Sequence, residues 1–294
     1  MSQPLRSDRS LPYIYVGPIV LLLGLVSLFP LCYNVFTSLR SYNILNPEDD
    51  KFVGSDNYLQ AFRDSDFWNS LVITLIFSFA AVSLEMLFGM LLAVLLNRKN
   101  TTGRQVYRTL MMLPIIMTPI AVSYMWRIIY APSTGILNYL LSRIGISGPL
   151  WIADVHWALP SLIIVDVWQW TPFLGLIFLS GLMSLPHDLL EAAKIDGASA
   201  WKSFCYITLP LMRPIIVIAV LIRMIDSFKL FDIVYALTGG GPLRATEALN
   251  FFIYRIAFKN LDIGYACALT ITLLLMISLL SLGLVKTGKI YDHA

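Results

Sequence analysis

Four charged residues lie three positions apart within a largely apolar stretch: Arg223, Asp226, Lys229 and Asp232. A step of three drifts slowly around a helix, so these residues should form one slanted stripe of alternating charge. A charge in the middle of a lipid bilayer costs about 2.5–3.5 kcal/mol, so the stripe should face protein or a water-filled cavity. Two interpretations remain open: a path or gate for a polar molecule, and ion pairs that lock helices together.

Aromatic and amide side chains form a second group in an earlier apolar stretch. Trp168-Gln169-Trp170 and Phe173 offer flat apolar faces beside an amide. This suits a sugar, because aromatic faces cover C–H groups and an amide meets hydroxyls; the alternative is an aromatic belt at a membrane surface. Asp166 lies one helical turn before Trp170, so the group does not lie wholly at such a surface. Glu85, in another apolar stretch, requires a basic partner on a different helix.

The apolar stretches are long enough to cross a membrane. Of the 294 residues, 57% are apolar and 13% are charged, with a mean hydropathy of +0.73, whereas soluble domains carry about 25% charged residues. A spanning helix needs about 20 mostly apolar residues. Five stretches built around charge-free runs, and a sixth interrupted by charges, lie near residues 12–36, 68–96, 109–130, 157–182, 263–285 and 214–237. The sequence therefore predicts an all-α membrane protein with six transmembrane helices.

Lys and Arg are unequally distributed between the two sides of these spans. The N-terminus, residues 97–108, residues 183–213 and the C-terminus together hold eleven of them, whereas the longer loops on the other side hold seven. Because basic loops remain in the cytoplasm, both termini and the 183–213 loop are predicted to be cytoplasmic. The expected organisation is a tail over residues 1–11, one six-span domain over 12–286 and a second tail over 287–294.

Other residues that could perform chemistry are sparse. The three cysteines and three histidines are scattered, without the spacing of a disulfide framework or a metal site. No G-x-x-x-x-G-K-[ST] sequence is present, so the chain lacks the usual loop that cradles ATP phosphates. The net charge of +3 gives no indication of nucleic-acid binding. We therefore expect no catalytic residue, metal or cofactor in this chain.

The 183–213 segment is polar and helix-forming, and it lies between two apolar spans. Proline, aspartate and serine favour the first turn of a helix, glycine favours its left-handed end, and proline cannot continue it. These signals lie, in order, at Pro186, Asp188, Asp196-Gly197, Ser199 and Pro210. They predict a first helix that Gly197 stops, a tight turn, and a second helix from Ala200 to Thr208 that Pro210 ends.

A known motif occupies the same segment. Glu191-Ala192-Ala193 is followed by Gly197, Ile207, Leu209 and Pro210. At this spacing the segment resembles the EAA loop of the membrane permeases of binding-protein-dependent ABC importers. Three further stretches resemble the carbohydrate-uptake (maltose/glycerol-3-phosphate-type) subgroup of that family: Phe52-Val53-Gly54 with Asn57-Tyr58, Thr238-Gly239-Gly240-Gly241-Pro242, and Arg223 to Asp232. The resemblance covers about residues 12–286.

This resemblance implies a type I ABC importer permease fold with a cytoplasmic coupling helix that docks in a cleft of an ATPase. Glu191 would pair with a basic group of the ATPase, and Gly197 would hold the turn. The implied docking residues are Glu191, Ala192, Ala193, Asp196 and Gly197. The implied substrate-path residues are Gln169, Trp170, Phe173, Arg223, Asp226, Ser227 and Leu230.

The resemblance also implies several partners. They are an ABC ATPase homodimer, which carries the ATP and Mg²⁺, a second permease subunit, an extracytoplasmic solute-binding protein, a carbohydrate substrate and membrane lipid. The expected location is a bacterial or archaeal cytoplasmic (inner) membrane. The alternative function is a secondary carrier, in which the charged stripe from Arg223 to Asp232 couples ions to the substrate without an ATPase.

Overall fold

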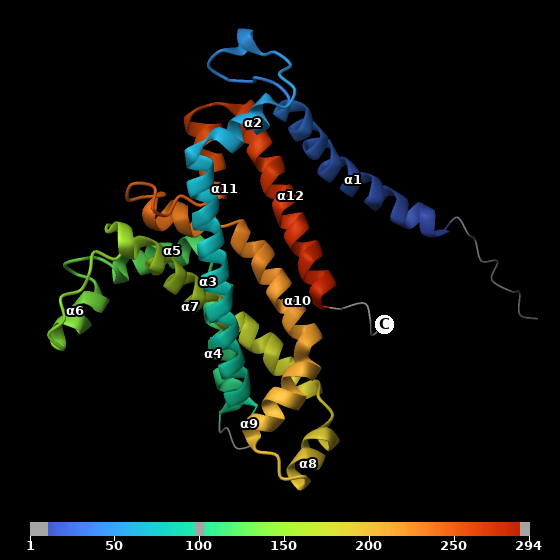
Figure 1. The fold of residues 1–294 in the computed structure, drawn as a ribbon, viewed down its shortest axis with the longest axis vertical. Helices are drawn as coiled ribbons and strands as arrows, with labels where there is room; N and C mark the ends of the chain where they lie inside the picture. Colours follow the sequence, from blue (N-terminus) through green and yellow to red (C-terminus); the bar gives the residue numbers. More distant parts are fainter. Residues whose placement is uncertain (1–10, 98–102, 289–294) are drawn as a thin grey trace, which may run out of the picture. The chain divides into compact units, whose positions relative to one another are not determined.

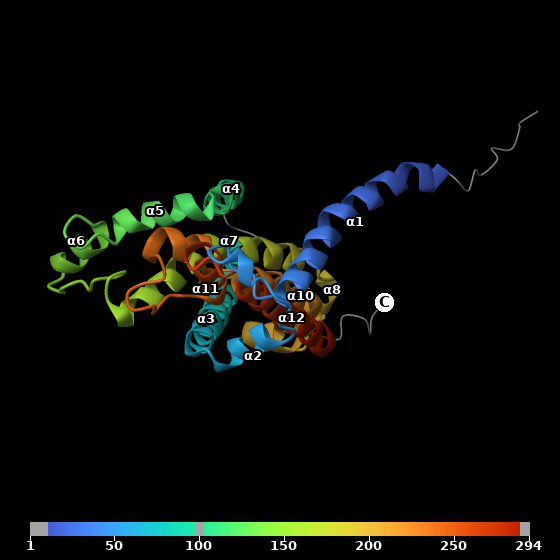
Figure 2. The ribbon, with the colours of Figure 1, turned by 90° about the horizontal axis from the view of Figure 1, so that it is seen from above.

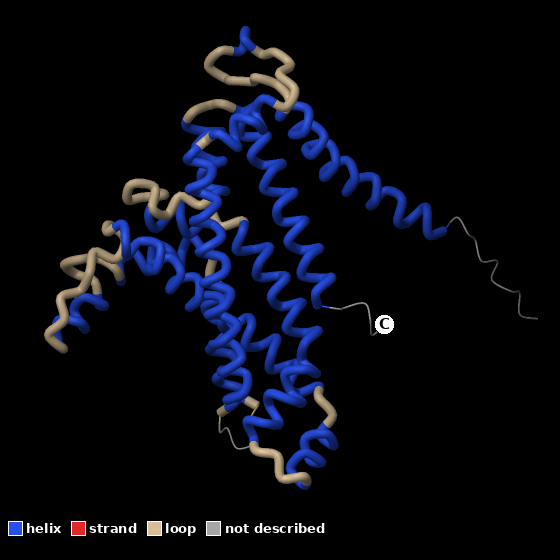
Figure 3. Tube along the Cα trace, viewed as in Figure 1, coloured by secondary structure: helices blue, strands red, loops and turns tan. Residues whose placement is uncertain are grey.

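The computed structural model describes residues 11–97 and 103–288, and these residues form helices joined by loops, without a β-strand (Figures 1 and 3). The predicted all-α fold is therefore confirmed for the described part of the chain. The two tails expected over residues 1–11 and 287–294 lie outside it, apart from Leu11 at the start of the first helix and residues 287–288 at the end of the last.

Most of the helices are α-helical, and short π-helical segments continue or precede some of them. The α-helices are α1 (Leu11–Ser38), α2 (Asp56–Arg63), α3 (Ser65–Leu96), α4 (Arg104–Ile116), α5 (Pro119–Ile129), α6 (Ile136–Arg143), α7 (Val155–Ser184), α8 (His187–Ile195), α9 (Ala200–Ser203), α10 (Leu209–Phe228), α11 (Leu249–Tyr254) and α12 (Ile263–Gly288). The π-helical segments are Phe204–Thr208, Val234–Thr238 and Arg255–Lys259, and Pro47–Asp49 forms a 3-10 turn.

Five helical stretches of the described residues are long and apolar enough to cross a membrane, and the bent pair α4–α5 gives a sixth. The five are Tyr15–Ser38, Ser65–Leu96, Val155–Ser184, Ala200–Phe228 and Ile263–Lys286. These positions match five of the predicted spans in order and mostly to within three residues, but the span predicted at 214–237 lies at Ala200–Phe228. The predicted six-span architecture is therefore confirmed when α4 and α5 are counted together.

The third predicted span is not one straight helix. α4 and α5 meet at 96°, and α6 follows at the end of α5 away from α4 (Figure 2). Pro119 disfavours the helical conformation of the preceding residue, and Thr118 is extended, with φ −66° and ψ 143°. The Thr118 hydroxyl then accepts a hydrogen bond from the Ala121 N–H and caps α5. Thr118-Pro119 therefore divides into two helices the stretch that hydropathy alone predicts to be one span.

The second helix of the 183–213 segment also differs from the prediction, because Pro210 does not end it. α9, the π-helical segment and α10 form one continuous helical stretch from Ala200 to Phe228. In the π-helical turn the Leu209 N–H reaches the Phe204 carbonyl, and Pro210 follows this widened turn directly. The same stretch ends at Phe228, so the predicted span to residue 237 was too long.

The chain divides into two compact units, of which the first contains residues 1–63 and 253–272. In this unit the loop after α1 is fixed by Asn57, whose amide donates to the carbonyls of Ser38 and Arg40 at 2.8 and 2.9 Å. Arg40 also forms a two-point ion pair with Asp50 at 2.8 and 2.9 Å, and this hydrogen bonding raises the pKa of the guanidinium. Asn57, noted as part of a family motif, thus closes the loop after α1.

The second unit contains residues 64–252 and 273–294. Its core lies where α3, α7 and α10 pack together, around buried residues such as Phe178, Leu179 and Met212. α3 and α7 can approach closely because Gly89 has no Cβ. An added Cβ there would lie only 3.0 Å from the Leu174 Cβ. Small residues at a crossing allow helices in a membrane to pack tightly. This packing brings the charged residues of three helices within reach of one another.

Candidate functional site

The loop between α7 and α10 has the helix–turn–helix form that the sequence predicts. α8 begins after Pro186 and carries Asp188 in its first turn, where the helix dipole favours an acid. Gly197 has a left-handed φ of +75°, and the Ala198 N–H donates to the Ala193 carbonyl at 2.9 Å. The helix end is therefore closed by a glycine turn.

The predicted docking residues do not all face outward. Glu191, Ala192, Asp196 and Gly197 are exposed. Ala193 is 7% exposed, so it packs against its own chain. Three large apolar side chains of this loop, which were not among the predicted residues, are 73–86% exposed: Ile195, Trp201 and Tyr206. Large apolar residues within a polar loop were the available signal. Trp201 and Tyr206 also belong to the stretch Ala200–Phe228, which is long and apolar enough to cross a membrane.

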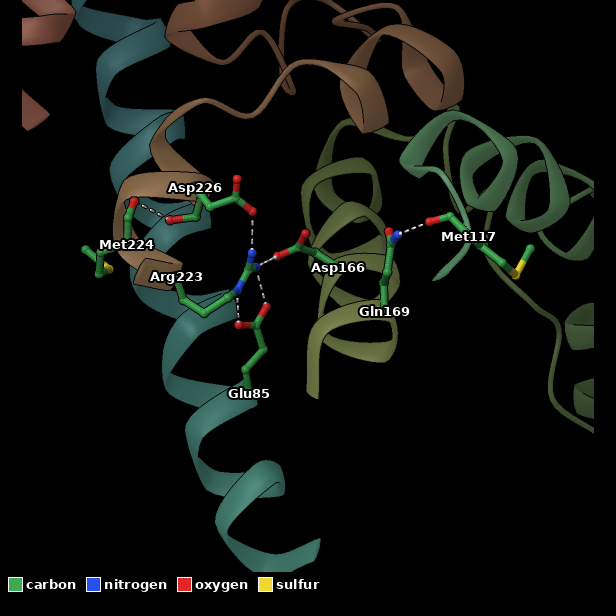
Figure 4. Close-up of polar contacts among 8 residues, drawn as sticks. Glu85, Met117, Asp166, Gln169, Arg223, Met224 and Asp226 are labelled. Atoms are coloured by element: carbon green, nitrogen blue, oxygen red, sulfur yellow. Dashed lines mark hydrogen bonds and ion pairs between the residues drawn. The ribbon is translucent and has the colours of Figure 1, made fainter. Parts of the chain in front are cut away.

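A cluster of ion pairs joins α3, α7 and α10 around Arg223 (Figure 4). The guanidinium donates two bonds to Glu85 at 2.7 and 2.8 Å, one to Asp166 at 2.8 Å and one to Asp226 at 2.8 Å. Arg223 is 1% exposed and Glu85 is fully buried. Arg223 is thus the basic partner that Glu85 was predicted to need, and the ion-pairing interpretation is confirmed for Arg223 and Asp226.

The predicted stripe of four charges is not continuous. α10 ends at Phe228, Lys229 occupies its C-cap position, and residues 229–231 form a break before the next helical segment. Asp232 therefore lies beyond the helix that carries Arg223 and Asp226. The predicted stripe requires one continuous helix from Arg223 to Asp232. Because α10 ends at Phe228, the prediction of one stripe is wrong.

Part of the predicted substrate path lines one hollow of about 410 Å³. The hollow is lined by Trp170, Phe173, Ile222, Arg223, Ile225, Asp226 and Lys229. The rings of Trp170 and Phe173 meet edge to face at 6.0 Å, and the Arg223 guanidinium lies over the Trp170 ring at 4.6 Å. Aromatic faces, a carboxylate and an ammonium group thus surround a space of the size that small-molecule sites have.

The remaining path residues lie elsewhere. Gln169 is 1% exposed, and its amide donates to the Met117 carbonyl at 3.1 Å, at the bend between α4 and α5 (Figure 4). The Ser227 hydroxyl donates to the Met224 carbonyl at 3.0 Å, and Leu230 is 7% exposed. The structure therefore gives Gln169 and Ser227 partners within the protein and does not place these three residues on the hollow.

Comparison with known proteins agrees with this arrangement. Residues 85–286 match the family described as "Binding-protein-dependent transport system inner membrane component". The chain is 41% identical over 257 residues to the "Probable ABC transporter permease protein y4oQ" of Sinorhizobium fredii, covering 87% of this chain and 82% of the relative. It is 35% identical over 283 residues to the "Trehalose/maltose transport system permease protein MalF" of Thermococcus litoralis, covering 96% and 95%.

A solved structure has the same fold. It is a chain of a bacterial alginate ABC transporter in complex with an alginate pentasaccharide-bound periplasmic protein, with a TM-score of 0.82, 22% identity and 98% coverage of both chains. The family match decides against a secondary carrier. The chain belongs to the family of inner membrane components of binding-protein-dependent transport systems, and it is a permease of the ABC transporter class.

Proposed function

We propose that this permease imports a carbohydrate (a sugar, an oligosaccharide, a polyol or a glycerol derivative) and is driven by ATP hydrolysis in separate subunits. The observation that carries the proposal is the loop around Gly197, which presents an exposed Glu191 and three exposed apolar side chains next to a membrane-spanning helix. A transport subunit needs such a surface to receive force from an ATPase. The carbohydrate substrate is supported by the names of relatives for trehalose and maltose and by Trp170 and Phe173 in the hollow.

In this proposal the loop docks on an ABC ATPase homodimer that binds ATP and Mg²⁺. Glu191 pairs with a basic group of the ATPase, and Ile195, Trp201 and Tyr206 pack against its surface. Because helix continues from Ala200 to Phe228, a movement of the loop passes directly to the helix that carries Arg223. Closure of the ATPase pair then tips the spans from an inward-open to an outward-open arrangement.

The proposed assembly contains two further proteins. A second permease subunit completes the path, since one six-span chain does not enclose a sugar, and an extracytoplasmic solute-binding protein delivers the substrate. The alginate transporter structure contains a periplasmic protein of that kind. We place the chain in a bacterial or archaeal inner membrane, with both termini and the 183–213 loop in the cytoplasm.

Purification of the tagged chain in mild detergent tests the proposed assembly. Mass spectrometry of the co-purifying proteins should identify a nucleotide-binding subunit and a second permease. After reconstitution with the binding protein in liposomes, sugar uptake should require ATP. A chain that purifies alone and transports sugar without ATP would contradict the proposal.

Substitution of the loop tests the docking residues. Glu191→Lys should reduce ATP-dependent uptake at least about tenfold, because a reversed charge repels the basic partner. Glu48→Lys, which reverses an exposed charge in the first outer loop, is the matched control and should leave uptake unchanged. Gly197→Ala should also reduce uptake, since the left-handed φ of +75° is strained for alanine. A steric clash is not the reason, because no described residue other than the chain neighbours of Gly197 lies within 4 Å of the added Cβ. Wild-type uptake by both loop variants, with folded protein, would remove the loop from the coupling mechanism.

A further inference from the structure

A second hollow, about 460 Å³ in volume, lies between α3, α4 and α7, and we call it the α4 groove. α4 lines it with Tyr107, Leu110, Met111 and Pro114, along about two helical turns. The described side chains that line it are apolar or aromatic apart from Thr171, and none is charged. These walls suit a long apolar chain rather than a sugar, because they offer few partners for hydroxyls.

The α4 groove faces away from the hollow beside Trp170. On α7 it is lined by Trp168, two positions before Trp170. Two positions turn about 200° around a helix, so the two hollows lie on opposite sides of α7. The proposed second permease completes the sugar path on the Trp170 side, and this step alone rests on the proposed function. The α4 groove then faces the bilayer, and Phe88 and Leu110 in its walls are exposed.

Arg108 lies at one end of the α4 groove, beside Tyr107 and near the start of α4. Its Nη2 donates to the Met183 sulfur, a weak acceptor, at 3.0 Å. Its Nε is buried without a hydrogen-bond partner, and no ion pair among residues 11–97 and 103–288 includes it. A phosphate can accept two hydrogen bonds from a guanidinium. Arg108 therefore retains donors for an anion that the described chain does not supply.

The sequence around Arg108 is also basic. Residues 97–108 hold four Lys and Arg and no acidic residue, and no Asp or Glu lies between Glu85 and Asp154. α4 begins and α7 ends at this end of the groove, next to the 183–213 loop that we place in the cytoplasm. Basic pockets between transmembrane helices on the cytoplasmic side bind anionic lipid headgroups.

We infer that the α4 groove binds an anionic phospholipid of the cytoplasmic leaflet, with an acyl chain along α4 and the phosphate at Arg108. The apolar walls give little preference among lipids, because the chain leaves one apolar surrounding for another. The charge of the headgroup therefore sets the preference. Phosphatidylethanolamine carries an ammonium group that competes with Arg108 for its own phosphate, whereas phosphatidylglycerol carries none and is bound more tightly.

A phosphatidylglycerol probe with a diazirine in its acyl chain tests the location of the lipid. The purified full chain in mild detergent is irradiated with the probe, and the labelled peptides are mapped by mass spectrometry. We expect labels within residues 107–114 and 167–172. Unlabelled phosphatidylglycerol should compete with the probe at least about fivefold better than phosphatidylethanolamine with the same acyl chains. Labelling confined to other apolar surfaces would overturn the inference.

Arg108→Gln tests the proposed phosphate partner. Glutamine offers no positive charge, so the fivefold preference for phosphatidylglycerol should fall to about one. Lys202→Gln is the matched control, because it removes an exposed cation of the 183–213 loop that does not line the groove, and it should keep the preference. An Arg108→Gln chain with the preference of the wild type would exclude Arg108 as the headgroup site.

A photoreactive side chain in the assembled importer shows what covers the groove in the complex. Leu110, which lines the groove and is exposed, is replaced by p-benzoylphenylalanine, and the complex is irradiated in liposomes that contain phosphatidylglycerol. A cross-link to the lipid supports the inference. A cross-link to the second permease assigns the groove to a protein helix and overturns the inference, while the proposed function stands. Neither readout depends on sugar uptake, so a failure to import sugar would count against the proposed function alone.

Discussion

Arg223 shows how a single side chain can connect three helices inside a membrane protein. Glu85 on α3 and Asp166 on α7 are buried, and the guanidinium from α10 supplies hydrogen bonds to both. A buried ion pair adds little net stability compared with apolar residues, but removing one partner leaves the other charge uncompensated. The cluster therefore favours the packing of α3, α7 and α10 against one another, with Glu85, Asp166 and Arg223 at the same level along the helices.

Replacement of Arg223 by an apolar residue should destabilise the fold. For Arg223→Met we expect a loss of about 3–5 kcal/mol, because two buried carboxylates lose their cation. The measurement is the unfolding midpoint of the purified protein in detergent. Addition of Glu85→Gln and Asp166→Asn to Arg223→Met should recover much of the loss, since no buried charge then remains. A single variant as stable as the wild type would contradict the structural role of Arg223.

The partners of Arg223 mark the limit of what the sequence allows at this scale. The need of Glu85 for a base was predictable, because a lone carboxylate within an apolar stretch requires compensation. The sequence did not show that this base is Arg223, because Arg223 lies 138 positions further along the chain and helical periodicity relates only close neighbours. Asp226 was predictable as a partner of Arg223, because the two residues are three positions apart and lie one turn from each other on the same helix.

At the scale of the helices, local signals explain where the structure departs from hydropathy. Hydropathy identified the membrane-crossing stretches, because length and apolar composition suffice for that. It did not reveal the bend at Thr118-Pro119 or the helix end at Phe228, which depend on backbone geometry. It also did not show that a π-helical turn carries the helix past Pro210. The positions of breaks within apolar runs therefore require structure or a close reading of proline context.

The bend between α4 and α5 should depend on Gln169. The amide of Gln169 satisfies the partly buried Met117 carbonyl at the break, and a fully buried carbonyl without a partner costs about 1–3 kcal/mol, which sets the upper limit here. Gln169→Leu should therefore lower the free energy of unfolding by roughly this amount. The comparison is Gln105→Leu on α4, an exposed position that should change stability little. Unchanged stability with impaired sugar binding would instead return Gln169 to the substrate path.

At the scale of the whole molecule, the family and the six-span architecture were accessible from the sequence, because the motif of the 183–213 loop and the pattern of apolar runs occur together. The orientation in the membrane rests on Lys and Arg counts of eleven against seven. The lining of the hollow was predicted in part: Trp170, Phe173, Arg223 and Asp226 line it, whereas Gln169, Ser227 and Leu230 do not. Sequence spacing identifies a helix face but not which neighbour covers it.

Orientation can be measured with single cysteines in a chain whose native cysteines are replaced. Ala192→Cys in the 183–213 loop should react with a membrane-impermeant maleimide only after the inner membrane of the cells is permeabilised, because the loop is expected in the cytoplasm. Ser55→Cys, exposed in the loop after α1, should react once the reagent has access to the outer face of the inner membrane. The reverse pattern would invert the proposed topology.

The order of synthesis gives the Arg223 cluster a further consequence. α3 and α7 are made before α10, so Glu85 and Asp166 enter the membrane while the cation that pairs with them is still unmade. Until α10 inserts, the nascent protein holds two carboxylates without an arginine, a state that lipid penalises. A chain that stops before α10 therefore keeps two carboxylates within its apolar helices without their cation, whereas the finished chain pairs both with Arg223.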